Sequence, residues 1–323
     1  MKKLALFSER ANFLSNLKSE EQLMKKVSKI QQNRNRAYFT MMLPGLLVMV
    51  IIFAFPLGKL LINSFQKYKL IDPNGIKFIG FQNYVNAFKD KAFIKSIGLT
   101  LKYVFYSLLI ELPLALIMME IISTVKKGGD LVKILFLPPM VMPSVVTGTI
   151  WRLMFNATFG IIPWILSHFG IYANEWLTQN NTALFCLVAV DIWASTPFLL
   201  IIFLSGRATI STDLYEAALI DGAGRVKAFF KITLPLIRNT IMFGLMLRLT
   251  DCIRVFPTIH IMTAGGPGTA TQTLNYYIYK TAFSWSNIGY SSAMGIIELL
   301  ISIALVLVLQ KAFYVGKKKE RGN

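Results

Sequence analysis

Several charged residues stand inside long apolar runs of this sequence, and they are the side chains best able to do chemistry. In one run, Arg248, Asp251 and Arg254 follow each other at i, i+3 and i+6, so neighbouring members can pair along one helix face. A charge inside a membrane segment costs several kcal/mol unless it meets a cavity or a partner. These residues therefore either face a solute, or pair with one another or with a partner subunit and hold helices in register.

Hydrogen-bonding and aromatic side chains in and around the same runs suggest a path for a polar solute. Hydroxyl groups need hydrogen-bond partners, and the C–H groups of a ring pack on aromatic faces. A guanidinium can grip a carboxylate in two places, so an arginine would suit an acidic solute. The candidate pathway residues are Trp151, Arg152, Asp191, Trp193, Asp251, Arg254 and Tyr277. Glu111 and Glu120 are interpreted as lying near the inner half of their span or at a helix contact, and they are left out of this set.

Six apolar stretches are long enough to hold these residues inside a membrane, since a spanning helix needs roughly 20 mainly apolar residues. Hydrophobic residues make up 54% of the 323 residues, and charged residues make up 15%, whereas a soluble domain carries about 25% charged residues. We predict an all-α polytopic membrane protein with six transmembrane helices, at 37–65, 97–123, 131–154, 183–205, 240–262 and 289–315. Prolines inside these stretches predict bent helices.

The distribution of Lys and Arg over the loops predicts that both termini are cytoplasmic. With that orientation, the inside segments 1–36, 124–133, 206–238 and 315–323 hold nine, three, five and four of them. The outside loops 66–96, 154–182 and 263–288 hold six, none and one, so the first outside loop runs against the rule. This placement accounts for the net charge of +18 without nucleic-acid binding.

Three regions are expected along the chain. Residues 1–36 form a basic cytoplasmic segment, either an amphipathic helix on the inner membrane surface or an unstructured tail. Residues 37–315 form the transmembrane domain, with a cytoplasmic loop at 206–238, and residues 316–323 form a basic cytoplasmic tail. No cleavable signal peptide is predicted, because no apolar core precedes Ala37.

Several kinds of chemistry find no support in the residues. Cys186 and Cys252 lie in apolar runs and are interpreted as core residues, and His168 and His260 are isolated, so we predict no disulfide and no metal site. There is no G-x-x-x-x-G-K-[ST] phosphate loop. No catalytic constellation is visible either, so we expect no enzyme activity, and energy for transport must come from a partner.

The loop between the fourth and fifth stretches predicts two short helices on the cytoplasmic side. Thr212 and Asp213 are candidate N-caps, Gly222 and Gly224 break the helix, and Pro235 ends the second helix before the next span. Small residues would line one face, and two aromatic rings would project from the second helix: Ala217, Ala218, Ala223, Phe229 and Phe230. This shape suits docking into a cleft on a soluble partner.

The residues Glu216-Ala-Ala-x-x-Asp-Gly-Ala, followed by Ile232-x-Leu-Pro235, resemble the EAA loop of bacterial ABC importer permeases. In that family the loop is a coupling helix that sits in a groove of the ATPase subunit. The resemblance implies that Glu216 pairs with a basic ATPase residue, that Ala217 and Ala218 permit close approach, and that Gly222 allows the turn. The implied coupling residues are Glu216, Ala217, Ala218, Asp221, Gly222 and Ala223.

Two further segments are similar to the carbohydrate branch of that family: Phe78-Ile-Gly-Phe-Gln-Asn-Tyr84, and Met262-Thr-Ala-Gly-Gly-Pro-Gly-Thr-Ala-Thr-Gln-Thr-Leu274 with Tyr279 and Phe283. The resemblance runs from about residue 40 to the C-terminus, and it gives the N-terminal extension no role. It implies a type I permease fold in the bacterial cytoplasmic (inner) membrane. The partners would be a second permease, two ATPase subunits that bind ATP and Mg, and an extracytoplasmic solute-binding protein.

The expected function is therefore to form half of the pathway of an ATP-driven importer for a carbohydrate, with an oligosaccharide, including an acidic one such as alginate, as the favoured solute. Alternatives with the same fold are a permease for glycerol phosphate or polyamine. An ATPase-independent secondary transporter or channel is a further alternative, and import that continues without any ATPase would favour it.

Overall fold

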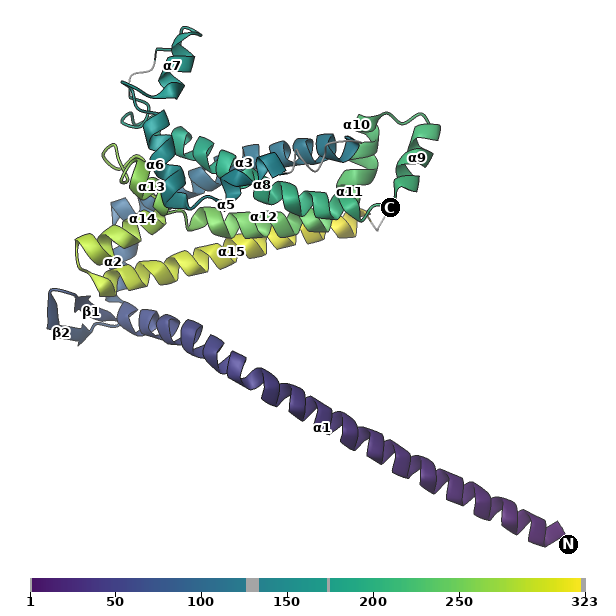
Figure 1. Ribbon diagram of the computed structural model, residues 1–323. Coiled ribbons are helices and arrows are strands. Elements are labelled where there is room, and N and C mark those ends of the chain that lie inside the picture. The colour runs from purple at the N-terminus through teal and green to yellow at the C-terminus, as the bar shows by residue number, and fades with distance from the viewer. Residues whose placement is uncertain (1, 126–133, 173–174, 321–323) are drawn as a thin grey trace. The chain divides into compact units, whose positions relative to one another are not determined.

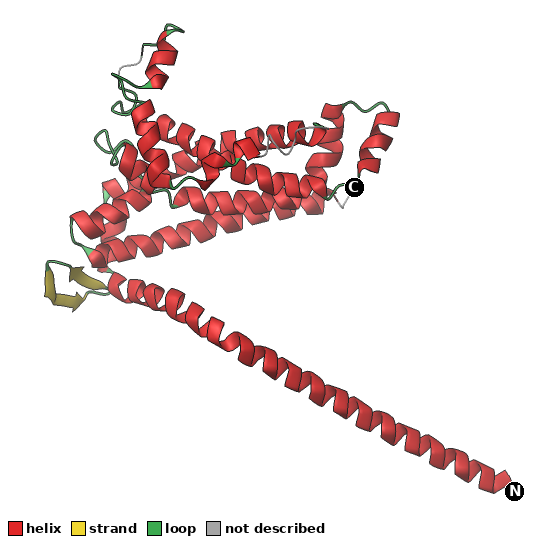
Figure 2. Ribbon diagram, in the orientation of Figure 1, coloured by secondary structure: helices red, strands yellow, loops and turns green. Residues whose placement is uncertain are grey.

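The computed structural model describes residues 2–125, 134–172 and 175–320. The chain forms two compact units, Met1–Lys59 and Leu60–Asn323. Helices dominate both units, and a single two-stranded hairpin is the only sheet among the described residues (Figure 2). Residues 126–133, which include the start of the third expected span, and residues 321–323 of the basic tail lie outside the described residues.

Helix α1 (Lys2–Ser64) contains all the described residues of the first unit and continues into the second. Its part from Asn33 to Ser64 is long and apolar enough to cross a membrane, and none of its most apolar window is buried inside the structure. Pro44 and Pro56 lie within the helix. The helix is continuous across the expected boundary at residue 36, and the separate amphipathic segment stays a prediction. Its position on a membrane surface stays a prediction, because the side chains of residues 1–28 lie outside what the structure describes.

The second unit is a bundle of helices whose long members run side by side (Figure 1). In chain order its elements are β1 (Gln66–Lys69), β2 (Asp72–Phe78), α2 (Gln82–Lys89), α3 (Lys91–Thr124), α5 (Pro138–Val141), α6 (Ser144–Met154), α7 (Ile161–Ser167), α8 (Ala183–Ala208), α9 (Thr212–Ile220), α10 (Arg225–Ala228), the π-helix η1 (Phe229–Thr233), α11 (Leu234–Leu236), α12 (Arg238–Ile253), α13 (Pro257–Met262), α14 (Leu274–Tyr279), the π-helix η2 (Lys280–Ser284) and α15 (Ile288–Glu320).

Four of the six expected spans appear as continuous helices, in α1, α3, α8 and α15. The described part of the third expected span, 131–154, is instead broken into α5 and α6. Pro138, Pro139 and Pro143 lie in this region, and each lacks the N–H that a helix interior requires. Met142, just before Pro143, takes an extended conformation with ψ of 133° and separates the two helices.

The fifth expected span, 240–262, is also interrupted. Helix α12 ends at Ile253, and α13 begins at Pro257 after Phe256 leaves the helical region with φ of −141°. On its other side, α12 meets Arg225–Leu236 at a bend of 70°. The described residues therefore hold four helices able to cross a membrane, or five if this bent pair counts as one span.

The hairpin joins the beginning of the second unit to its last helix. Gln66 pairs with Phe78 in an antiparallel register, and Lys69 forms a bridge with Asn287 just before α15. A side chain at Gly289 would place its Cβ 2.0 Å from the backbone oxygen of Gln66, so only glycine fits this contact. Segments more than 200 residues apart thus meet through their backbones.

The Gly-x-x-Asn-Tyr segment, Gly80–Tyr84, forms hydrogen bonds with the residues where α1 ends and β1 begins. The Asn83 amide donates to the backbone oxygens of Ser64 and Gln66, each at 2.9 Å. The hydroxyl groups of Tyr84 and Ser64 lie 2.7 Å apart. The segment therefore fixes the end of α1 to the strand that follows it.

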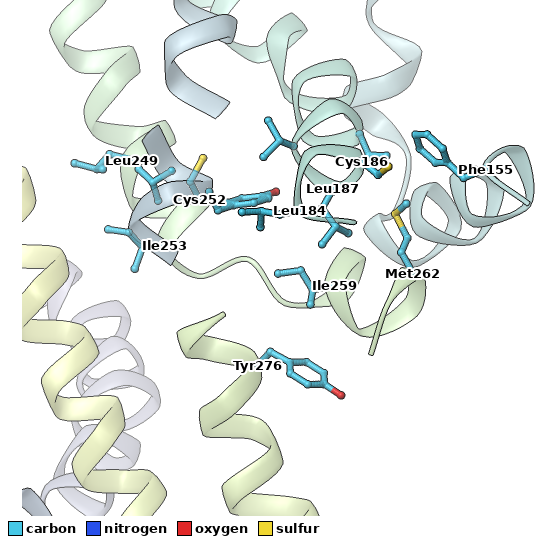
Figure 3. Packing of buried hydrophobic residues seen from close by; sticks show 14 residues of the cluster. Phe155, Leu184, Cys186, Leu187, Leu249, Cys252, Ile253, Ile259, Met262 and Tyr276 are labelled. Atoms are coloured by element: carbon cyan, nitrogen blue, oxygen red, sulfur yellow. The ribbon is translucent and has the colours of Figure 1, made fainter. Parts of the chain in front are cut away.

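Two clusters of buried side chains hold α3, α8 and α12 together. One cluster includes Tyr103, Leu187, Cys252 and Ile259, and the last three are labelled in Figure 3. The second lies toward the end that carries α9, and it includes Phe203. A polar cavity opens along α8 and α12.

Candidate functional site

A buried ion cluster forms around Arg248, whose side chain is 2% exposed. Its Nε and Nη2 donate to the two carboxylate oxygens of Glu111, on α3, at 2.9 and 2.8 Å. The same Nη2 donates to Asp191 on α8 at 2.8 Å, and Nη1 donates to Asp251 at 2.6 Å. The predicted Arg248–Asp251 pair along α12 is formed, but it is one part of a cluster that joins three helices.

Sequence reasoning left Glu111 out of the candidate set and placed it either near the inner half of its span or at a helix contact. In the structure it is fully buried and forms the two-pronged contact with Arg248, which sequence reasoning did not predict. The two residues are 137 positions apart, so no local spacing could pair them. The available signal was chemical, because an acid and a base inside separate apolar runs are each costly unless they meet.

Three predicted pathway residues, Asp191, Asp251 and Arg254, line one cavity of about 520 Å³. Helices α5, α6, α8 and α12, with the start of α13, supply its walls. The Asp251 side chain is 69% exposed, and the Arg254 Nε donates to the Thr250 carbonyl at 3.3 Å. The cavity therefore presents carboxylate acceptors and a guanidinium donor, the groups that bind hydroxyls.

The remaining pathway candidates lie outside this lining. Trp151 and Trp193 pack edge to face with ring centroids 5.4 Å apart. Arg152 donates to the Ile261 carbonyl at 3.0 Å and lines two other cavities, of about 420 and 550 Å³. Tyr277 is buried and 3% exposed, away from all three cavities. The structure thus brings three of the seven candidates together.

Tyr277 instead belongs to a junction centred on Asp90, the N-cap of α3. The Tyr277 and Tyr290 hydroxyls donate to one Asp90 oxygen at 2.6 and 2.9 Å, and the amides of Ala92 and Phe93 donate to the other. Burial would raise the pKa of Asp90, but these hydrogen bonds outweigh it and lower the pKa below 3.8. Burial and the Asp90 contact also raise the pKa of Tyr277. The junction fastens α3, α14 and α15 together.

The loop between α8 and α12 folds into the two expected short helices, with different caps. Ser211 caps α9 by accepting from the Asp213 amide at 3.3 Å, one position before the two expected caps. Gly222 ends α9 with φ of +70°, and the Ala223 amide donates to the Ala218 carbonyl at 2.8 Å. Gly224 keeps an ordinary extended backbone and starts α10.

This loop exposes a mixed apolar and charged surface at the same end of the bundle as the C-terminal part of α15 (Figure 1). Ile220 is 86% exposed and Phe230 is 58% exposed, whereas Phe229 packs against the neighbouring core cluster. Exposed acidic residues lie in α9 and at its end, and exposed basic residues lie in α10 and η1. The acidic residues are Asp213, Glu216 and Asp221, and the basic residues are Arg225, Lys227 and Lys231. Exposed apolar surface rimmed by charged residues is typical of interaction sites.

Within the residues described, no group of three or more His, Cys, Asp or Glu side chains is placed to hold a metal ion. Cys186 and Cys252 are both buried and unpaired.

The long apolar helices of this fold define a polytopic membrane protein. The family model for the binding-protein-dependent transport system inner membrane component matches residues 111–316. The chain belongs to this family. It is a permease subunit of an ABC importer, as the sequence resemblance predicted, and in such systems a partner ATPase hydrolyses ATP.

Relatives span nearly the whole chain. The trehalose/maltose transport system permease protein MalF of Thermococcus litoralis is 32% identical over 88% of this chain and 96% of its own. The sn-glycerol-3-phosphate transport system permease protein UgpA of Escherichia coli O157:H7 is 31% identical over 87% and 94%. A chain from the crystal structure of a bacterial ABC transporter involved in the import of the acidic polysaccharide alginate matches with a TM-score of 0.77 and 25% identity, over 87% and 96%.

Proposed function

We propose that this subunit forms half of the import pathway for a carbohydrate, and that the solute is an oligosaccharide. The observation that carries the proposal is the cavity in which Asp191, Asp251 and Arg254 meet. Its carboxylates can accept hydrogen bonds from sugar hydroxyls, and its guanidinium can donate to ring and hydroxyl oxygens. The names of the MalF relative and of the alginate transporter support a saccharide.

The proposed complex contains a second permease, two ATPase subunits that bind ATP and Mg, and an extracytoplasmic solute-binding protein. A structure of the alginate transporter in complex with an alginate pentasaccharide-bound periplasmic protein supports the last of these partners, with a TM-score of 0.75 to this chain. The loop 206–238 and both termini are proposed to be cytoplasmic, in the bacterial inner membrane. The Lys and Arg counts support this orientation.

Coupling to the ATPase is assigned to Glu216, Ala217, Ala218, Asp221, Gly222 and Ala223. Glu216 is exposed on α9, and Ile220 beside it offers apolar surface. A matching groove would therefore have an apolar floor with basic residues facing α9 and acidic residues facing α10.

The solute is tested by purifying the whole complex with its binding protein and identifying what that protein carries by mass spectrometry. Uptake into proteoliposomes then compares a neutral oligosaccharide, an oligouronate and sn-glycerol 3-phosphate. We expect import of an oligosaccharide. Import of glycerol phosphate alone would replace the carbohydrate assignment, and the UgpA relative is the observation that favours this second candidate.

Coupling is tested separately with Glu216→Lys. We expect loss of the ATPase from the purified complex and loss of ATP-dependent uptake, because the new lysine would face the basic side of the groove. Asp72→Lys in the hairpin strand β2 makes the same change of charge far along the chain and serves as the control. Import by the Glu216→Lys complex at the wild-type rate, or import without any ATPase, would contradict the assignment.

A further inference from the structure

We propose that Tyr215 is the positioning residue through which a movement of α9 reaches the transmembrane helices. Helix α9 stands at the end of the bundle (Figure 1). None of its nine residues is fully buried, and only Tyr215 and Ala218 are half-buried. Tyr215 is the α9 side chain that packs against the core cluster of α3, α8 and α12. The backbone also connects α9 to the bundle, through the short segment after α8 that contains the buried Ile210 and through α10. The inference rests on the proposed function of α9.

The Tyr215 ring contacts the end of α8. The guanidinium carbon of Arg207, in the last turn of α8, lies 4.0 Å from the centroid of the ring. A guanidinium over an aromatic face is attracted by the ring's electrons, and this attraction strengthens where water is excluded. The side chain of Arg207 is only 16% exposed. The contact therefore fastens α9 to the helix that supplies Asp191 to the cavity.

The Tyr215 hydroxyl contacts a second element. It lies 2.8 Å from Oγ1 of Thr233, which is fully buried in η1. Through α11, η1 leads directly into α12, the helix that carries Asp251. One side chain therefore contacts α8 directly and reaches α12 through η1 and α11.

Arg207 extends the link to a third helix. Its Nε lies 3.9 Å from a carboxylate oxygen of Glu120 on α3, a contact between charges that is too long for a hydrogen bond. Next to Arg207, a Cβ on Gly206 would come within 2.7 Å of the Thr240 hydroxyl, so α8 and α12 are in close contact here. The long ion pair lets Arg207 follow the Tyr215 ring, while the tight crossing of α8 and α12 passes a displacement on.

The test uses the assembled transporter in proteoliposomes with its solute-binding protein. The variants are Tyr215→Ala, Tyr215→Phe, Arg207→Gln and the double variant, and Tyr172→Ala, at an 82% exposed tyrosine, is the control. Three quantities are measured: ATPase subunits retained per complex, ATP hydrolysis stimulated by loaded binding protein, and solute imported per ATP hydrolysed. A purely structural role would change assembly and leave the imported-to-hydrolysed ratio unchanged.

We expect Tyr215→Ala to retain the ATPase and to import about tenfold less solute per ATP. Tyr215→Phe keeps the ring over Arg207 and should lose less. Arg207→Gln should resemble Tyr215→Ala, and the double variant should be no worse than either single variant, because both remove one link. An unchanged ratio in Tyr215→Ala and Arg207→Gln, or additive losses in the double variant, would overturn the proposal.

If Tyr215→Ala fails to assemble, Arg207→Gln decides, because that side chain lies on α8. If the Arg207→Gln complex imports less solute per ATP hydrolysed than wild type, the role of Tyr215 is supported. If its ratio equals that of wild type, the proposal is overturned. Failure of the broader assignment looks different: the wild-type complex would bind no ATPase or would import without ATP.

Discussion

Replacing Arg248 by methionine should destabilise the protein strongly. In the described cluster its guanidinium is the single positive charge, and it contacts all three carboxylates. Glu111 is fully buried and Asp191 is 14% exposed, so both would lose their partner inside the protein. Breaking a buried pair by removing one member costs about 3–5 kcal/mol. We therefore expect Arg248→Met to lower the free energy of unfolding by about 3–5 kcal/mol.

Two further variants separate the contributions. Asp251→Asn should cost less than about 1 kcal/mol, because the Asp251 side chain is 69% exposed and its ion pair is screened by solvent. Adding Glu111→Gln to Arg248→Met should recover part of the loss, with a coupling of up to about 3 kcal/mol, since it removes the charge left unpaired.

The assay is reversible denaturation of the purified transporter in mixed detergent micelles at a rising SDS fraction, followed by tryptophan fluorescence. The expected order of stability is wild type, then Asp251→Asn, then the double variant, with Arg248→Met last. The reasoning fails if Arg248→Met is as stable as Asp251→Asn, or if Glu111→Gln makes the Arg248→Met protein less stable still.

Three other predictions concern single positions. Because folding lowers the pKa of Asp90, its ionised carboxylate stabilises the fold above pH 3.8, and this contribution is lost as pH falls through the pKa of the folded state. The difference in stability between wild type and Asp90→Asn should therefore shrink between pH 6 and pH 3 in thermal melts. A constant difference would contradict this prediction. Gly289→Ala should cost about 1–3 kcal/mol by overpacking, whereas Gly98→Ala, with open space around it, should be tolerated; equal melting temperatures would refute this. Gly222→Ala places a side chain at φ of +70° and should cost about 1–2 kcal/mol, while Gly224→Ala should not; hydrogen exchange of the loop compares the two.

The long helices were predictable because each needs only a continuous apolar run, which is a local property of the sequence. The third and fifth spans were expected as whole helices, since hydropathy averages over the breaks at Pro143 and Pro257. The prolines themselves were visible and indicated bends. What a single sequence does not reveal is whether a proline bends a helix or divides it, because neighbouring helices decide which backbone groups find partners.

In the loop and in the charge cluster, features set by neighbouring residues were predictable, and contacts between residues far apart in the sequence were not. The turn at Gly222 follows from the conformational freedom of one residue, and it was predicted. The Arg248–Asp251 pair follows from helix spacing, and it was predicted as well. The contacts of Arg248 with Glu111 and of Tyr277 with Asp90 join residues 137 and 187 positions apart. Such contacts are set by how the helices pack, and no periodicity in the sequence carries them.

The bridge between Lys69 and Asn287 constrains the order in which the protein can be built. The hairpin is synthesised early, yet the backbone of Leu70 finds its acceptor only at Ser286, 2.8 Å away, after the intervening helices have been made. Until then the outer edge of β1 is an open strand edge. The edge of β1 is therefore paired only once the segment that leads into α15 has been synthesised. A chain truncated before residue 286 would leave that edge unpaired.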